Sequence, residues 1–173
     1  MRWDTARWDE ELAKTGVCME HAPIIDRETI DMLREMDAIT EDDLLVELID
    51  DFLNHSAGIM AEIQMSAQGL DYRKLAANAH SLKGASLNIG VLGLFSICDQ
   101  IETLARTLTT LHGPQEIRSG ENSQRMMESA MAVAQYVAEL EPTYQLTATA
   151  LADLRDRTSR GEAIDDLLCS SAP

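Results

Sequence analysis

Apolar residues recur at intervals of three and four positions along most of this chain, the spacing that aligns side chains on one face of an α-helix. The pattern is strongest after Thr40, where the apolar positions are Leu44, Leu45, Leu48, Ile49, Phe52, Leu53, Ile59, Met60, Ile63 and Leu70. The opposite face carries Glu47, Asp50, Asp51, Asn54 and Glu62. We therefore expect one long amphipathic helix over roughly residues 42–68, with Thr40 as its N-cap.

A shorter helix is predicted before it. Asp26 has the side chain of an N-cap, and the apolar positions that follow at helical spacing are Ile30, Leu33 and Met36. Residues 1–25 are polar and carry two tryptophans, Trp3 and Trp8. A short helix over residues 4–14 that packs on the core and a loose tail both fit this N-terminal extension.

Two further helices follow after short connections. Gly69 ends the long helix and Asp71 suits the next N-cap, so a helix over residues 72–89 is expected. Its predicted core positions are Leu75, Ala79, Leu82, Ser86 and Ile89. Gly90 ends that helix, and the next one has the core positions Leu94, Ile97, Cys98, Ile101, Leu104, Ala105, Leu108 and Leu111 before it closes at His112. Connections this short make consecutive helices antiparallel neighbours.

The last long apolar stripe consists of Met126, Ala130, Val133, Val137 and Leu140. Pro142 either kinks this helix or starts a new segment that continues to about residue 157, and the remainder is a weak helix or a tail. The pattern predicts an all-α protein, an antiparallel up-down-up-down four-helix bundle with a short N-terminal capping helix and an extra C-terminal helical segment. We divide the chain into an extension (1–25), the bundle (26–140) and a C-terminal helical extension or tail (141–173).

Composition narrows the functional class. Of 173 residues, 45% are hydrophobic but only 4% aromatic, which suits helices rather than strands. The formal charge of −16 argues against nucleic acid or an anionic membrane as partner. The three cysteines (Cys18, Cys98 and Cys169) show no disulfide or metal spacing, and neither a secretory signal nor a bilayer-spanning run is visible. We expect an acidic, cytoplasmic, monomeric protein.

The stretch AANAHSLKGASLNIG, residues 76–90, holds the candidate chemistry. His80 lies one position beyond the core residue Ala79, at the solvent edge of its helix. Its neighbours on that face are Ala76, Ala77, Lys83 and Gly84, so the imidazole stands on a platform of small residues that a large partner could reach. A glycine inside a helix costs about 1 kcal/mol relative to alanine. Close approach of another molecule is one reason for Gly84, and close packing between helices is another.

The local charge supports a negative group on this histidine. From Tyr72 to Cys98 the chain has no Asp or Glu, although it has 30 acids and 14 bases in all. Neutral imidazole is a nucleophile near pH 7, since its reference pKa is about 6.5. A phosphoryl group on the ring would add about two negative charges, which Lys83 could pair. We therefore expect an acid-free face around His80 and Lys83.

These residues resemble a known signature. AHSLKG followed by LNIG is similar to the pattern of histidine-containing phosphotransfer (HPt) domains, Ala-His-x-Leu-Lys-Gly and then a Gly about six residues later, here Gly90. The helices before and after the stretch, LLVELIDDFLNHSAGIMAEIQ and LFSICDQIETLAR, also resemble the family. The resemblance covers residues 26–140.

The resemblance implies roles for individual residues. His80 matches the phosphorylated histidine, Lys83 the lysine that steadies the phosphoryl group, and Gly84 the glycine that lets a receiver domain dock. Glu102, on the neighbouring helix, matches the polar residue that orients the imidazole. Partner contacts are expected from Arg73, Ala76, Ala77, Leu87 and, at the rim, Arg106.

The family shuttles phosphoryl groups between aspartates of response-regulator receiver domains. The resemblance therefore implies a phosphorelay intermediate whose partners are a receiver domain and a histidine kinase or hybrid kinase. It implies no kinase or ATPase activity and no cofactor of its own, because the receiver supplies the Mg²⁺. An HPt-like module that binds a partner without phosphotransfer is the alternative.

Less specific interpretations remain beside these. His80 could be a structural or merely exposed polar residue, Lys83 a solvated surface lysine and Glu102 a plain surface acid. Asp51 and His55 have the i, i+4 spacing of metal ligands, but no matching ligands face them. A metal–carboxylate bundle would need paired Glu-x-x-His motifs, which are lacking, so we expect no metal site.

Overall fold

Helices form almost all of the structure, a computed structural model that describes residues 25–40, 43–111 and 120–168. In chain order they are α2 (Arg27–Thr40), α3 (Leu44–Gln68), α4 (Tyr72–Asn88), α5 (Leu92–Leu111), α6 (Gly120–Arg160) and the short 3₁₀-helix η1 (Asp165–Leu167). The described residues contain no strand, only an isolated antiparallel bridge between Ile25 and Val91. The predicted all-α class is confirmed.

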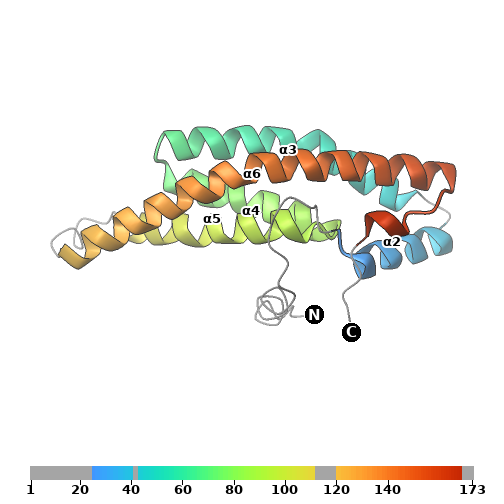
Figure 1. Cartoon of the computed structure of the whole chain (residues 1–173), viewed down its shortest axis with the longest axis horizontal. Coiled ribbons are helices and arrows are strands. Elements are labelled where there is room, and N and C mark those ends of the chain that lie inside the picture. Colours follow the sequence, from blue (N-terminus) through green and yellow to red (C-terminus); the bar gives the residue numbers. More distant parts are fainter. Residues whose placement is uncertain (1–24, 41–42, 112–119, 169–173) are drawn as a thin grey trace.

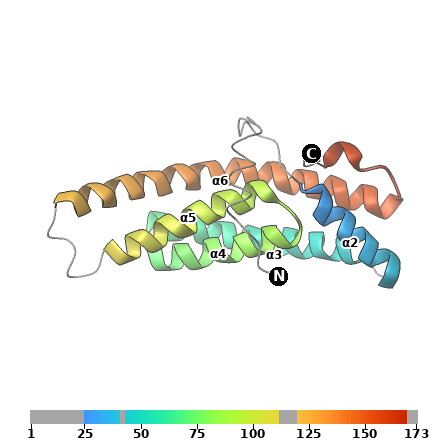
Figure 2. The same cartoon turned by 90° about the horizontal axis from the view of Figure 1, so that it is seen from below.

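The four long helices, α3 to α6, form an up-down-up-down bundle (Figure 1). Side-chain contacts give the helix directions. Gln64 and Asp50 of α3 bond Glu141 and Arg155 of α6 at 2.8 and 2.9 Å, so these helices run antiparallel. Figure 2 shows α6 along the whole length of the bundle, with α2 at one end.

The core is made of the apolar stripes predicted from the sequence. All five positions predicted for α4 and its C-cap are buried: Leu75, Ala79, Leu82, Ser86 and Ile89. They meet side chains that are also below 2% exposure, including Leu45, Ile49, Ile63, Leu94, Ile101, Leu108 and Leu140. This interior fixes the rotation of α4 about its axis, and so decides which side chains of α4 face solvent.

Helix ends follow local capping chemistry, with one correction. Asp26 accepts hydrogen bonds from the Thr29 amide (2.9 Å) and hydroxyl (2.6 Å), and Asp71 accepts from the Lys74 amide at 3.1 Å, as expected of N-caps. The prediction of Thr40 as an N-cap is wrong. No glycine or proline interrupts α2 before Thr40, so the helix continues to that residue, and Asp43 is the N-cap of α3.

The turn between α4 and α5 anchors the start of α2. Gly90 adopts φ +70°, and a Cβ there would lie 2.8 Å from the Thr29 Cβ. The Asp26 amide donates to the Gly90 carbonyl at 2.8 Å, beside the bridge between Ile25 and Val91. Only glycine combines this left-handed backbone with so close a neighbour.

α6 runs through Pro142 and reaches Arg160, so it crosses the boundary drawn after residue 140 without a break. Leu140 and Tyr144, on either side of the proline, are buried in the bundle. The proline therefore neither ends the helix nor starts a new one, because tertiary packing holds the backbone on both sides.

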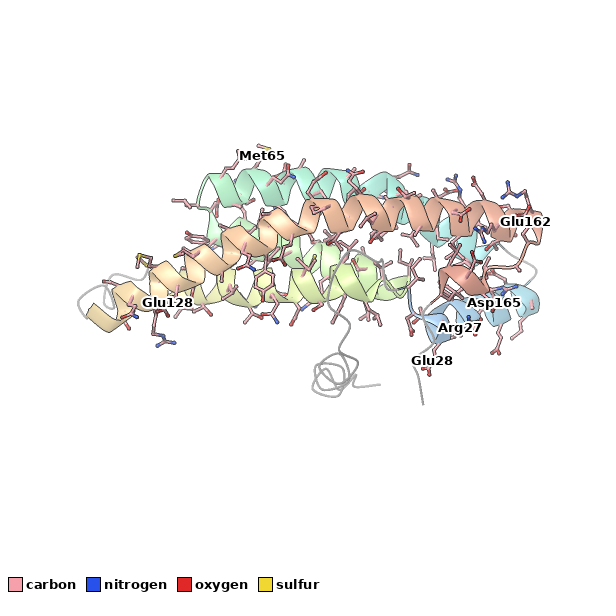
Figure 3. All side chains as sticks on the ribbon, in the orientation of Figure 1. Arg27, Glu28, Met65, Glu128, Glu162 and Asp165 are labelled. Carbon is pink, nitrogen blue, oxygen red and sulfur yellow. The ribbon has the colours of Figure 1, made fainter. Side chains whose placement is uncertain are left out.

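Residues 161–168, which we call the C-terminal turn, fold back onto α2. Ile164 and Leu168 are 3% and 8% exposed and join the core. Arg27 of α2 bonds the Asp165 carboxylate at 2.7 Å and its carbonyl oxygen at 3.1 Å, and Figure 3 shows this pair at the α2 end of the bundle. The apolar side chains of this segment explain why it packs on the bundle.

Two predictions fall on residues outside the described ranges, the helix over residues 4–14 and the helix end at His112. Among helices of the described residues, none has both the length and the apolar character needed to cross a bilayer.

Candidate functional site

His80 lies in the middle of α4 with its side chain 64% exposed, which places it on the solvent edge as predicted. The exposed residues Arg73 and Ala77 lie seven and three positions before it, and the exposed residues Gly84 and Leu87 lie four and seven positions after it. That spacing puts the five residues on one face of the helix. Because the core binds the other side of α4, this face is presented outward.

The buried carboxylate of Glu102, on α5, holds the imidazole from the side of the bundle. His80 Nδ1 lies 3.1 Å from Oε1 and 3.2 Å from Oε2 of Glu102. The Glu102 side chain is 7% exposed, so it is not the plain surface acid that the sequence left open. The contact is the one that the resemblance implied for these two residues.

Two cations also bond this carboxylate. Lys83 Nζ lies 2.6 Å from Oε2, and an Arg106 guanidinium nitrogen lies 2.5 Å from Oε1. Burial raises the pKa of the Glu102 carboxyl, but the hydrogen bonds from Lys83, His80 and Arg106 lower it by more, so its pKa lies below the ordinary value. Glu102 is therefore ionised near neutral pH and can only accept hydrogen bonds.

The ionised acceptor fixes the tautomer of the histidine. Because Glu102 offers no proton, His80 Nδ1 carries the hydrogen and donates it to the carboxylate. The neutral ring then has its lone pair on Nε2, the nitrogen on the far side from Glu102. A nucleophilic nitrogen on an exposed ring, backed by a carboxylate, is an arrangement suited to accepting an electrophilic group.

Lys83 is bound between two acids of α5. Its ammonium contacts Asp99 Oδ1 at 3.0 Å as well as Glu102, and its side chain is 20% exposed. Burial lowers the pKa of Lys83, but hydrogen bonds to Glu102 and Asp99 outweigh it and raise the pKa above its ordinary value. The expectation of an acid-free face is thus wrong. The chain is free of acids only to Cys98, and the antiparallel α5 brings the next acids back against α4.

Sequence reasoning did not single out Asp99. Its position three residues before Glu102 puts both carboxylates on one face of α5, one turn apart, and that spacing could have identified it. Once Glu102 is placed beside the histidine, the residue one turn earlier on the antiparallel helix faces Lys83. Asp99 is 45% exposed, so it forms the outer edge of the cluster.

Gly84 is exposed in α4, and a Cβ added there would meet nothing within 4 Å. Close packing against another helix of the described residues, the alternative kept for this glycine, is therefore excluded, because none of them places an atom within 4 Å of that Cβ. Its backbone is also not in the left-handed region. The glycine therefore costs helix stability, and no contact among the described residues requires it.

Ala76 departs from the expected platform. It is 8% exposed, because it lies beside Leu75 and one turn from Ala79 on the core side of α4. Arg106, expected at the rim, is 65% exposed and reaches the site through its bond to Glu102. Arg73, Ala77 and Leu87 remain on the outward face.

The metal alternative gains no support from the structure. His55 Nδ1 donates to the Asp51 backbone carbonyl at 2.8 Å, which accounts for the i, i+4 pair as a local contact. Within the described residues, no group of three or more His, Cys, Asp or Glu side chains could hold a metal ion.

Comparison with known proteins agrees with this geometry. The family model for the Hpt domain matches residues 47–163, from the first turn of α3 to the C-terminal turn. The chain belongs to the Hpt domain family. The matched range of this Hpt domain includes α6 beyond Pro142, whereas the division predicted from the sequence places the extension at residues 141–173.

One curated relative of this Hpt domain is the multistep phosphorelay regulator 1 of Schizosaccharomyces pombe. The two are 24% identical over 110 residues, which cover 64% of this chain and 37% of the relative. The chain thus spans well under half of that protein's length. No solved structure matches the chain.

Proposed function

We propose that this protein is a phosphorelay intermediate in which His80 accepts a phosphoryl group from the aspartate of a receiver domain and passes it to another receiver. The single observation that carries the proposal is the exposed and oriented imidazole ring of His80. His80 is 64% exposed, while its Nδ1 is bonded to the buried, ionised Glu102, which leaves the Nε2 lone pair outward. Membership of the Hpt family and the likeness to a phosphorelay regulator support it.

The proposed transfer is a displacement at phosphorus. The Nε2 lone pair attacks the phosphorus of the receiver's aspartyl phosphate, a P–N bond forms, and the P–O bond to the aspartate breaks. The electron pair of that bond stays on the aspartate carboxylate. The proton remains on Nδ1, so the phosphorylated ring is cationic, and Glu102 balances that charge. The receiver supplies the Mg²⁺, and the reverse reaction delivers the group to the next receiver.

The outward face of α4 suits the partner that this reaction needs. A receiver must bring its aspartate to within bonding distance of Nε2, so the backbone near the histidine has to be accessible. Gly84 and Ala77, one turn after and one turn before His80, are small and exposed. Gly84 has open space where a Cβ would project, so a receiver can approach the α4 backbone beside the ring. Lys83 and Arg106 can pair the added negative charge.

The direct test is phosphotransfer from a radiolabelled receiver domain, with His80→Gln as the variant and His55→Gln as the matched control. His55 is also exposed on a helix, but it bonds a backbone carbonyl instead of a buried acid. We expect an acid-labile label on the wild-type protein and on His55→Gln, and none on His80→Gln.

Label retained in His80→Gln would overturn the assignment of the histidine. A stable complex with a receiver that survives His80→Ala, together with no label on the wild type, would instead identify the protein as a binding module without phosphotransfer.

A further inference from the structure

The ammonium of Lys83 is held by two acids of the neighbouring helix α5. Its bonds of 2.6 Å to Glu102 and 3.0 Å to Asp99 both lead to α5, where the two acids lie one turn apart. A phosphoryl group on Nε2 would stand on the outward side of the ring, opposite Glu102. To pair that group, Lys83 has to give up at least part of this arrangement.

Formal charges in the cluster cancel before phosphorylation. Two cations, Lys83 and Arg106, face two carboxylates, Asp99 and Glu102, around a histidine that is neutral in the tautomer described above. A phosphoryl group brings about two negative charges and leaves the ring with one positive charge, so the balanced site gains about one net negative charge. Without Asp99 the same site would carry one net positive charge and would hold the phosphoryl group more tightly.

The two acids differ in how easily they release Lys83. Glu102 is 7% exposed, so its charge depends on the donors around it. Asp99 is 45% exposed, so water can replace the ammonium there at little cost. The contact that opens when Lys83 turns toward a phosphoryl group is therefore the one with Asp99.

From this geometry we infer that Asp99 is a positioning residue that limits how tightly the site holds the phosphoryl group. It acts through Lys83, by holding the ammonium until a phosphoryl group competes for it, and through its own negative charge. It takes no part in making or breaking bonds. The inference rests on the proposed function, because it concerns the balance between phosphohistidine and aspartyl phosphate.

The test measures that balance at equilibrium. Wild-type protein and variants are mixed with the radiolabelled receiver domain that labels the wild type, and the ratio of phosphohistidine to aspartyl phosphate is read once it no longer changes. Asp99→Asn should raise this ratio about 3- to 10-fold, because a neutral side chain holds Lys83 less strongly and removes one repulsive charge. Asp99→Glu, which keeps the charge, should return it toward the wild-type value.

Asp50→Asn is the matched control. Asp50 is 48% exposed and bonds Arg155 at 2.9 Å, so this variant also loses one charge and one ion pair, but on α3 and next to α6. Its ratio should stay within about twofold of wild type, since screened charges act over about 10 Å. Thermal unfolding of each variant shows that it is folded, and Asp99→Ser provides a second neutral replacement.

The outcomes separate this inference from the proposed function. If His80 takes the label but both neutral variants match the wild-type ratio, Asp99 has no such role and the proposed function stands. A rise of equal size in Asp50→Asn would also overturn the inference, because it would reflect net charge alone. If no receiver labels the wild type at His80, the proposed function fails and the inference fails with it.

Discussion

The carboxylate of Glu102 lies 3.1 Å from Nδ1 of His80, and it is buried where the imidazole is exposed. Helix α4 thus presents the ring to solvent, while Glu102 of the neighbouring helix α5 bonds the ring from the interior. The division matters because a group in the core is held by packing, whereas a group on the surface must leave room for a partner. Helices α4 and α5 meet both conditions, because they run antiparallel in a register that places His80 beside Glu102.

Glu102→Gln should reduce the rate of phosphotransfer about 10- to 100-fold, the range seen when a carboxylate that orients a metal-binding histidine is lost. The amide can still accept from His80 Nδ1, but it no longer balances the charge of a phosphorylated ring. Single-turnover transfer from a labelled receiver measures the rate. Glu139→Gln, on α6 and bonded to Gln135 at 2.9 Å, is the matched control. A rate within about twofold of wild type in Glu102→Gln would contradict the role of the charge.

Acid should remove a stabilising contribution that depends on Glu102. Its folded-state pKa lies below 4.5, because hydrogen bonds from Lys83, His80 and Arg106 outweigh the effect of burial. The ionised carboxylate thus stabilises the fold fully above pH 4.5, and this stabilisation is lost as the pH falls through the lower folded-state pKa. Urea unfolding from about pH 7 to about pH 3 should show the gap in free energy between wild type and Glu102→Gln shrinking. A gap that stays constant would exclude this linkage.

Gly84→Ala should stabilise the protein and slow transfer. Nothing lies within 4 Å of the added Cβ, so the variant gains helix propensity of about 1 kcal/mol without a clash. We expect the melting temperature to rise by about 2–4 °C. The rate of transfer from a receiver should fall, because the methyl group stands on the docking face.

Gly58→Ala on α3 is the matched control for this pair of effects. It too has nothing within 4 Å of the added Cβ, so stability should rise in both variants while transfer falls only in Gly84→Ala. Equal transfer rates in the two variants would show that Gly84 does not serve docking.

Gly90→Ala should have the opposite effect on stability. Its φ of +70° strains any other residue, and the new Cβ would lie 2.8 Å from the Thr29 Cβ. We expect a loss of about 1–3 kcal/mol in the free energy of unfolding. Gly161→Ala separates the two causes, because Gly161 has φ +68° but no atom within 4 Å of an added Cβ. A loss in Gly90→Ala no larger than in Gly161→Ala would mean that Thr29 moves aside without cost.

The two glycines of the signature show how far the sequence could lead. Both follow His80 in the same motif. The pattern placed Gly90 at the end of the helix and left the role of Gly84 open, but it could not show the close neighbour of Gly90. That neighbour is Thr29, about sixty positions earlier. Contacts between residues so far apart are invisible to a reading based on helical spacing.

Local patterns predicted the local features well. The core side of α4, from Leu75 to Ser86, and the caps Asp26 and Asp71 follow from spacing and side-chain chemistry, and the structure has them as expected. The sequence missed what depends on neighbouring helices. The acids beside Lys83 come from α5, and the continuity of α6 at Pro142 depends on packing on both sides of the proline.

Arg27 and Asp165 lie 2.7 Å apart although 138 positions separate them in the chain. The beginning and the end of the described domain therefore meet at one place, at the α2 end of the bundle (Figure 3). A tether joined at either edge would start from nearly the same point. Whether a neighbour tethered there can reach His80 would then depend on the length of its linker, and hardly on the edge to which it is fused.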